Sequence, residues 1–313
     1  MNTFIRLAEV WKPSADGAVL ELAGGCYDAV PEFGGLSSRM RFRRGEGLPG
    51  TAWAEERPQL WGPLEDRRFL RAQAAADAHL TCALALPSLV DGRITSVAVL
   101  LCAGEASAQG AVELWHNDAR VTGDLRLAGG HFSPAGSAVE AMARDGWLPR
   151  GSGAPGLAWQ QGRSVFIERF DASPGFLRAQ AAAEAGLVRA LALPWGTAGS
   201  QAWVVSLLSS ALTPIAHRVE GWLVDRAAGT LRRGFGHCER LGRLPADDGP
   251  GLPIAAMGAI GRAARQGTAD VQRTAAGHAG LAPAEAVAAG LVSLLALPLP
   301  DDAGVSEVVA LYF

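Results

Sequence analysis

The sequence of 313 residues has no apolar run of eighteen or more residues, and only 28 of its residues are lysine or arginine. The missing run excludes a membrane-spanning helix of ordinary length. The net charge of −3 argues against a nucleic-acid surface, because binding to phosphates needs a concentrated basic patch. We therefore expect neither a membrane nor a nucleic acid among the partners of this protein.

Cysteine is also scarce. The four cysteines show no C-x-x-C spacing, which disfavours both zinc binding and thioredoxin-like chemistry. The first ten residues lack the apolar core and cleavage site of a signal peptide, so we expect a cytoplasmic protein without a disulfide framework. No Ser/His/Asp motif, phosphate loop or H-E-x-x-H motif is present.

What the sequence does contain is an internal repeat. The eight residues at 69–76 recur letter for letter at 176–183. Each copy leads into an apolar run that ends in a proline, and a third, diverged copy ends in the same way: Pro87, Pro194 and Pro298. These prolines lie roughly 105 residues apart, the size of small domains and far above the period of a solenoid. We predict three tandem domains at 1–107, 108–213 and 214–313, the third divergent.

Within each repeat the patterns predict the same order of elements. A hairpin comes first, at 7–22 in the first copy. One tryptophan takes the equivalent place in each hairpin: Trp11, Trp115 and Trp222. A polar segment follows, helical at 137–144 in the second copy, and then a glycine-proline turn that starts a short helix. In the third copy we place this turn at 249–253, with Met257 carried inward by the helix.

A short strand, an alanine-rich helix and a closing hairpin complete each repeat. The alanine-rich helix is the segment that recurs letter for letter, and its composition favours a helix. Taken together, the elements predict a central antiparallel sheet with helices on its faces, an α+β arrangement.

Three sequence motifs in this order of elements resemble those of the GAF domain family. They are the turn Gly45 to Gly50 before Trp53, the pair Arg57-Pro58 before the next strand, and the apolar strand Leu84 to Pro87. The resemblance covers nearly all of the first two repeats and is weaker in the third. It implies three tandem GAF-like domains. In this family a cavity between the sheet and the helices binds cyclic nucleotides, tetrapyrroles, amino acids or other metabolites, while many members bind nothing and serve dimerisation.

The resemblance points to side chains that could line such a cavity. Three of them stand five residues before the strand-end prolines, where they would face either a cavity or water at the sheet edge: Cys82, Arg189 and Ser293. Arg189 in a cavity would select a carboxylate or a phosphate. The other ligand-binding candidates are Trp53, Trp159, Arg71 and Arg178. The tryptophans can equally be core residues, and the arginines can equally be salt-bridging surface groups.

Cys26, His131 and His237 align just beyond the second strand of each repeat. A histidine at this place could ligate haem iron, and a cysteine could hold a bilin as in phytochrome-like GAF domains. The order His237-Cys238 is the reverse of the Cys-His order typical of bilin attachment. We therefore predict no cofactor, neither haem nor bilin, and solvated loop residues are the default for these positions.

Three functions remain open at this point. We favour a non-enzymatic sensory or regulatory protein that binds an unknown small molecule, a protein partner carrying the output function, or both, and signals in trans. The alternative is a thiol-dependent reductase resembling the GAF-type enzymes for free methionine sulfoxide, with Cys82 or Cys102 as the nucleophile. The third is a purely structural scaffold for dimerisation, and a homodimer would use domain faces.

Overall fold

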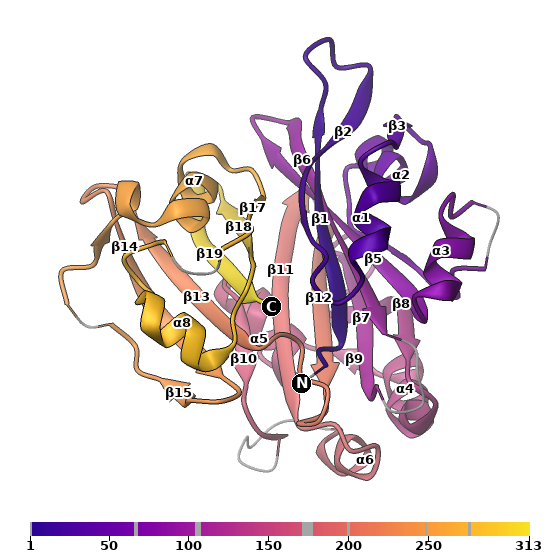
Figure 1. Cartoon of the computed structure of the whole chain (residues 1–313). Helices are drawn as coiled ribbons and strands as arrows, with labels where there is room; N and C mark the ends of the chain where they lie inside the picture. The colour runs from indigo at the N-terminus through magenta and orange to yellow at the C-terminus, as the bar shows by residue number, and fades with distance from the viewer. Residues whose placement is uncertain are drawn as a thin grey trace. The chain divides into compact units, whose positions relative to one another are not determined.

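The computed structural model describes residues 2–65, 68–103, 108–170, 178–198, 201–247, 249–274 and 277–313. Its strands form three sheets, one in each sequence repeat (Figure 1). Each sheet has its strands in the order third, second, first, sixth, fifth, fourth along the repeat, and one further strand of the third repeat pairs only with that repeat's second strand. The paired strands are antiparallel. The predicted α+β arrangement of antiparallel sheets with flanking helices is confirmed.

The first two sheets have six strands each. The first consists of β1 (Ile5–Pro13), β2 (Val19–Cys26), β3 (Arg41–Arg43), β4 (Gln59–Trp61), β5 (Leu80–Val90) and β6 (Arg93–Ala103). The second consists of β7 (Gly110–Asp118), β8 (Leu125–Phe132), β9 (Trp147–Leu148), β10 (Val165–Ile167), β11 (Arg189–Ala198) and β12 (Gln201–Ser209).

The third sheet and the helices complete the fold. The strands are β13 (Arg218–Asp225), β14 (Thr230–Cys238), β15 (Gly242–Leu244), β16 (Leu252–Pro253), β17 (Asp270–Gln272), β18 (Leu294–Asp301) and β19 (Gly304–Tyr312). The α-helices are α1 (Pro31–Ser37), α2 (Gly47–Glu55), α3 (Ala72–Asp77), α4 (Ser137–Asp145), α5 (Gly153–Gln161), α6 (Ala179–Glu184), α7 (Gly258–Gln266) and α8 (Pro283–Ala289). Short 3-10 helices lie at Pro134–Gly136 and Ile254–Ala256.

The hairpins predicted at both ends of each repeat are present. β1 pairs with β2 and β13 with β14, and the pairing skips one residue of the second strand beside the tryptophan in every repeat. The strand-end prolines have matching partners, since Pro194 faces Val204 and Pro298 faces Val308. The helix α1 was not predicted, and Phe176 and Leu177 of the recurring segment lie outside the described residues.

Contacts divide the chain into two compact units. One combines Met1–Phe4 with Ala103–Ile215 and therefore holds the second repeat; the other combines Ile5–Cys102 with Ala216–Phe313 and holds the first and third repeats. The three separate domains at 1–107, 108–213 and 214–313 stay a prediction.

Inside the second unit, the first and third repeats meet at a contact that we call the joint. Thr95 Oγ1 donates to the carbonyl oxygen of Gly267 at 2.9 Å, and the amide of Ala269 donates to Ser96 Oγ at 2.9 Å. Across the same joint, Ser293 Oγ donates to Asp28 Oδ2 at 2.6 Å. The first two bonds link the final hairpin of the first repeat to the segment between α7 and β17 of the third, and the last bond links the segment after β2 to the residue before β18.

Each repeat has its own core between the sheet and the helices. In the first repeat, Leu48 and Ala52 of α2 and Ala75 of α3 pack with Ala83 of β5 and Val99 of β6, and all five are buried. The second and third repeats have corresponding cores beneath α5 and α7. Burial of this apolar surface is the main term that stabilises domains of this size.

A glycine near the start of the central helix lies against the backbone of the preceding segment in every repeat. A Cβ added at Gly50 would lie 2.1 Å from the carbonyl oxygen of Arg43, and one at Gly156 would lie 2.4 Å from that of Pro149. In the third repeat the same relation holds for Gly261, whose added Cβ would lie 1.9 Å from the carbonyl oxygen of Ile254.

This geometry corrects the alignment of the third repeat. The equivalent turn is not at 249–253, as predicted from the Gly/Pro composition, but at the start of α7. Met257 is therefore the residue that precedes α7 and not the equivalent of Trp53, although it is fully buried. The pattern was misleading because 249–253 also contains glycine and proline while serving as a loop into β16.

The substitution Gly261→Ala tests this assignment. Alanine favours a helix over glycine by about 1 kcal/mol, so an ordinary helical position would be stabilised. Because the added methyl group meets a backbone oxygen, we expect the free energy of unfolding to fall by about 2–4 kcal/mol instead. Chemical denaturation measures the change. Gly35→Ala in α1 is the matched control, since nothing lies within 4 Å of its added Cβ and no loss is expected. Stabilisation by Gly261→Ala would contradict the assignment.

Candidate functional site

Each repeat buries a glutamate on its first strand. Glu9, Glu113 and Glu220 all have no exposed surface. Each accepts a hydrogen bond from the indole Nε1 of the tryptophan two residues later, at 3.0, 3.0 and 3.1 Å respectively. Residues two apart on a strand share a face of the sheet, so the Glu-x-Trp spacing places both side chains in the same core. A buried carboxylate needs a cationic partner, because desolvation of an isolated charge is very costly.

In the first two repeats this partner is the arginine of the recurring segment. Arg71 Nη1 donates to both carboxylate oxygens of Glu9, at 2.6 and 2.8 Å. Arg178 holds Glu113 with two nitrogens, Nη1 at 2.5 Å and Nη2 at 2.9 Å. Both arginines are buried, with 3% and 6% of their surface exposed. The reading of these arginines as surface groups is therefore wrong, although their salt-bridging role is confirmed.

The first repeat surrounds its ion pair with aromatic rings. The guanidinium carbon of Arg71 lies 4.8 Å from the ring centre of Phe33 and 5.6 Å from that of Phe69, and Trp11 also lies within cation–π distance. Tyr27 donates its hydroxyl to Glu9 at 3.0 Å. Side chains of the protein itself therefore occupy the space between sheet and helices.

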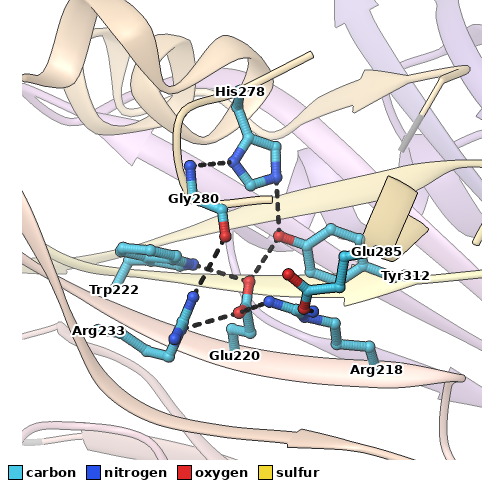
Figure 2. A network of polar contacts seen from close by, with 8 residues as sticks. All are labelled: Arg218, Glu220, Trp222, Arg233, His278, Gly280, Glu285 and Tyr312. Carbon is cyan, nitrogen blue, oxygen red and sulfur yellow. Dashed lines mark hydrogen bonds and ion pairs between the residues drawn. The ribbon is translucent and has the colours of Figure 1, made fainter. Parts of the chain in front are cut away.

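The third repeat has a larger network around Glu220 (Figure 2). It lacks an arginine in the place of Arg71 and instead uses two arginines on strands. Arg218 Nη2 donates to Glu220 Oε1 at 2.7 Å, and Arg233 Nε lies 2.9 Å from the same oxygen. Arg218 also pairs with Glu285 of α8, which ties that helix to the sheet.

A tyrosine and a histidine extend this network. Tyr312 donates its hydroxyl to Glu220 Oε2 at 2.6 Å, and His278 Nε2 lies 3.0 Å from the same hydroxyl. His278 Nδ1 accepts the amide hydrogen of Gly280 at 3.1 Å, so the neutral ring carries its proton on Nε2. Burial lowers the pKa of His278 and raises the pKa of Tyr312 well above its ordinary value. Both groups are thus held neutral near pH 7.

The two candidate nucleophilic thiols lie together in the first sheet. Cys82 of β5 and Cys102 of β6 are both fully buried and free of a disulfide. A hydrogen bond to Cys102, together with burial, raises the pKa of Cys82 well above its ordinary value. In the second sheet the corresponding residues, Arg189 and Ser209, are paired across the strands. A thiolate at Cys82 is therefore strongly disfavoured.

Ser293 and Cys26 lie at the joint. Ser293 is buried and donates to Asp28 of the first repeat, as described above, and it also hydrogen-bonds the thiol of Cys26. Burial raises the pKa of Cys26 to about 12. The structure therefore brings together two candidates that the sequence assigned to different repeats.

The remaining candidates are dispersed. Arg189 is half-buried at the start of β11 and donates to the carbonyl oxygen of Glu168 at 3.5 Å. Trp53 and Trp159 are partly buried against their own cores. His131 and His237 lie within β8 and β14 and not in loops, and His237 is 3.5 Å from Glu239. The ligand-binding roles of these residues stay predictions.

Cavities occur at two places along the joint. One, of about 600 Å³, lies between the final hairpins of the first and third repeats and the end of α7. The other, of about 710 Å³, is lined by β2, α1, Arg273 and Ser293. A smaller one of about 380 Å³ lies beside β4 in the first repeat. None of these cavities is lined by the buried glutamates or by Cys82. Among the described residues, no cluster of His, Cys, Asp or Glu could hold a metal ion.

The sequence reasoning missed the three glutamates, although a signal for them was present. The pattern Glu-x-Trp recurs at the same place in the first hairpin of every repeat, but only its tryptophans enter the sequence comparison above. A charged residue repeated on a strand that is otherwise apolar indicates a buried, paired carboxylate. The arginine partners could then have been sought in the segment that recurs letter for letter.

No protein-family profile and no curated protein matches the sequence. Parts of the chain are similar to solved structures, and each of the three matches named here covers 32% of this chain. One is the Nlh2 GAF domain of A. aeolicus in an inactive state, with 14% identity, 59% of that chain covered and a TM-score of 0.26. Another is an NreA protein of Staphylococcus aureus mutated in its nitrate-binding site, with 14% identity, 75% of that chain covered and a TM-score of 0.27. A third is a free methionine-R-sulfoxide reductase of Neisseria meningitidis in complex with its substrate, with 22% identity, 51% of that chain covered and a TM-score of 0.25.

The motifs at 45–53 and 84–87 predict GAF-like units, and the antiparallel sheets with their helices agree with this prediction. GAF domains are among the matched structures, and the match spans about three-fifths of the Nlh2 chain. Likeness at this level carries no argument about the activity of this chain. No helix in the described part of the chain is long and apolar enough to cross a membrane.

The pair Glu113–Arg178 provides a test of the buried ion pairs. In Glu113→Gln the arginine stays buried and loses its counter-charge, so we expect a loss of about 3–5 kcal/mol in the free energy of unfolding. The matched control is Glu140→Gln in the same unit. Glu140 pairs with Arg144 on the surface of α4, where such pairs contribute little, and its change is expected to be too small to resolve. Equal effects of the two substitutions in chemical denaturation would contradict this account.

Proposed function

We propose that this chain is a non-enzymatic regulatory protein that binds a small molecule at the joint between its first and third repeats and acts through a separate output protein. The observation that carries this proposal is the location of open space. The interior of each repeat contains a charge cluster built from its own residues, whereas the two larger cavities lie along the joint. A concave site between two packed modules is a common place for a small ligand.

The position of the cysteines supports binding over thiol chemistry. A reductase needs an accessible thiolate with a polar or positive setting around it. Cys82 and Cys102 are fully buried, and the raised pKa of Cys82 keeps its thiol protonated. Free methionine sulfoxide reduction, which the Neisseria meningitidis protein is named for, therefore finds no suitable nucleophile at these two positions.

The cavities also favour binding over a purely structural role. A scaffold needs no concave, partly apolar space at a contact between its own repeats, whereas small-molecule sites are concave and largely apolar. A ligand that fills a cavity at the joint would stabilise the contact of the two repeats by mass action. Such a change at the joint is a signal that a partner protein could read.

Thiol titration tests the non-enzymatic assignment. With Ellman's reagent at pH 8, we expect no rapid reaction of the native protein and four reactive thiols after unfolding, because all four cysteines are buried. A parallel assay of free methionine-R-sulfoxide with dithiothreitol should show no turnover above the buffer rate. A fast thiol in the native protein, together with turnover that Cys82→Ser abolishes, would overturn the proposal in favour of the reductase.

A further inference from the structure

The cavity of about 600 Å³ at the joint has the size of a small-molecule site and is formed by parts of both repeats. The β5–β6 hairpin contributes residues 88–91, and the equivalent β18–β19 hairpin contributes residues 300–305. The C-terminal end of α7 completes the wall with residues 264–267. Any ligand inside would therefore touch the first and third repeats at once.

Much of the lining is apolar. The apolar side chains come from both hairpins, from β13 and from the segment before α7: Leu89, Val90, Val224, Ile254, Pro298 and Val305. An apolar wall of this kind selects a ligand with a hydrocarbon body, because burial of apolar surface is its main source of affinity.

Acidic side chains outnumber basic ones around the cavity. Asp91, Asp301 and Asp302 line it together with Arg226 and Arg265. Arg226 is already engaged, because its Nη2 pairs with Asp301 and its Nε donates to the carbonyl oxygen of Val305 at 3.1 Å. The remaining charged groups are the carboxylates of Asp91 and Asp302 and the guanidinium of Arg265.

The end of α7 adds to the negative side of this balance. The last carbonyl groups of a helix carry partial negative charge, and α7 ends at the cavity with Gly267 in the left-handed conformation (φ 60°). The local field therefore favours a positively charged group in the ligand over a negative one.

We propose that the joint cavity binds a small amphipathic ammonium compound, with its hydrocarbon body on the apolar wall and its charged group near Asp91, Asp302 and the end of α7. This inference rests on the proposed binding function and adds the chemical class of the ligand. Binding would strengthen the joint, because Val90 of the first repeat already packs against Gly267 of the third.

A set of three probes with the same hydrocarbon chain tests the class of ligand. Hexylamine, hexanol and hexanoate are titrated into the 15N-labelled full chain at pH 7, and amide shifts at Ser88, Gly267 and Gly304 are followed. We expect saturable shifts with hexylamine, weaker ones with hexanol and none with hexanoate. Hexanoate binding as tightly as hexylamine would overturn the ammonium assignment. Absence of shifts at these amides with all three probes would overturn the site.

Two variants separate a binding role from a structural one. Asp91→Asn removes one of the two remaining carboxylates and should weaken hexylamine binding about threefold. Asp302→Asn should weaken it about threefold to fivefold, as expected for one charge pair near a protein surface. Asp77→Asn, on an exposed position of α3 away from the cavity, is the matched control and should change nothing.

Unchanged affinity in both cavity variants would contradict the proposal. These results are distinguishable from failure of the broader function. A reactive thiol with reductase activity would overturn the regulatory assignment, whereas saturable binding of a probe elsewhere in the chain would overturn only this site.

Discussion

The structure depends on a buried carboxylate in each of its three repeats. Placing a glutamate in an apolar core carries a large desolvation cost, which only a close cation and further hydrogen bonds can offset. Glu9, Glu113 and Glu220 receive these from an indole on the same strand and from arginine side chains. In the first two repeats the arginine precedes the alanine-rich helix, so the ion pair joins the sheet to that helix and fixes the geometry of the core.

The third repeat keeps a buried, neutralised glutamate although the residues that neutralise it differ. It has lost the arginine of the recurring segment, and two arginines from β13 and β14 neutralise Glu220 in its place. With two cations around it, the carboxylate also accepts the hydroxyl of Tyr312, and Glu285 balances the extra charge from α8. The divergence of this repeat in sequence is therefore a replacement of partners around an unchanged acid.

These clusters also bear on where a ligand could bind. In the first repeat, charged and aromatic side chains of the protein itself already occupy the space between sheet and helices. The two larger cavities lie where the first and third repeats meet, and both repeats contribute residues to the walls of each. Internal duplication thus supplies two modules, and their contact supplies a surface that a single module lacks.

Much of the fold could be predicted because it follows local patterns. The hairpins, the helix at 137–144 and the strand-end prolines come directly from alternation, turn residues and the repeat itself. The third glycine turn could not be placed reliably, because only the approach of Gly261 to the backbone of Ile254 distinguishes it from the Gly/Pro loop nearby. The burial of Arg71 and the cavity at the joint depend on long-range packing, which a single sequence does not encode in any short motif.

The hydrogen exchange of the indole N–H groups tests the central claim most directly. The chain has nine tryptophans, and three of them donate to buried carboxylates. After transfer to D2O, the indole signals of Trp11, Trp115 and Trp222 should persist as long as the amides of the central strands. Exchange of any of the three within the dead time, while the strand amides remain protected, would contradict the account.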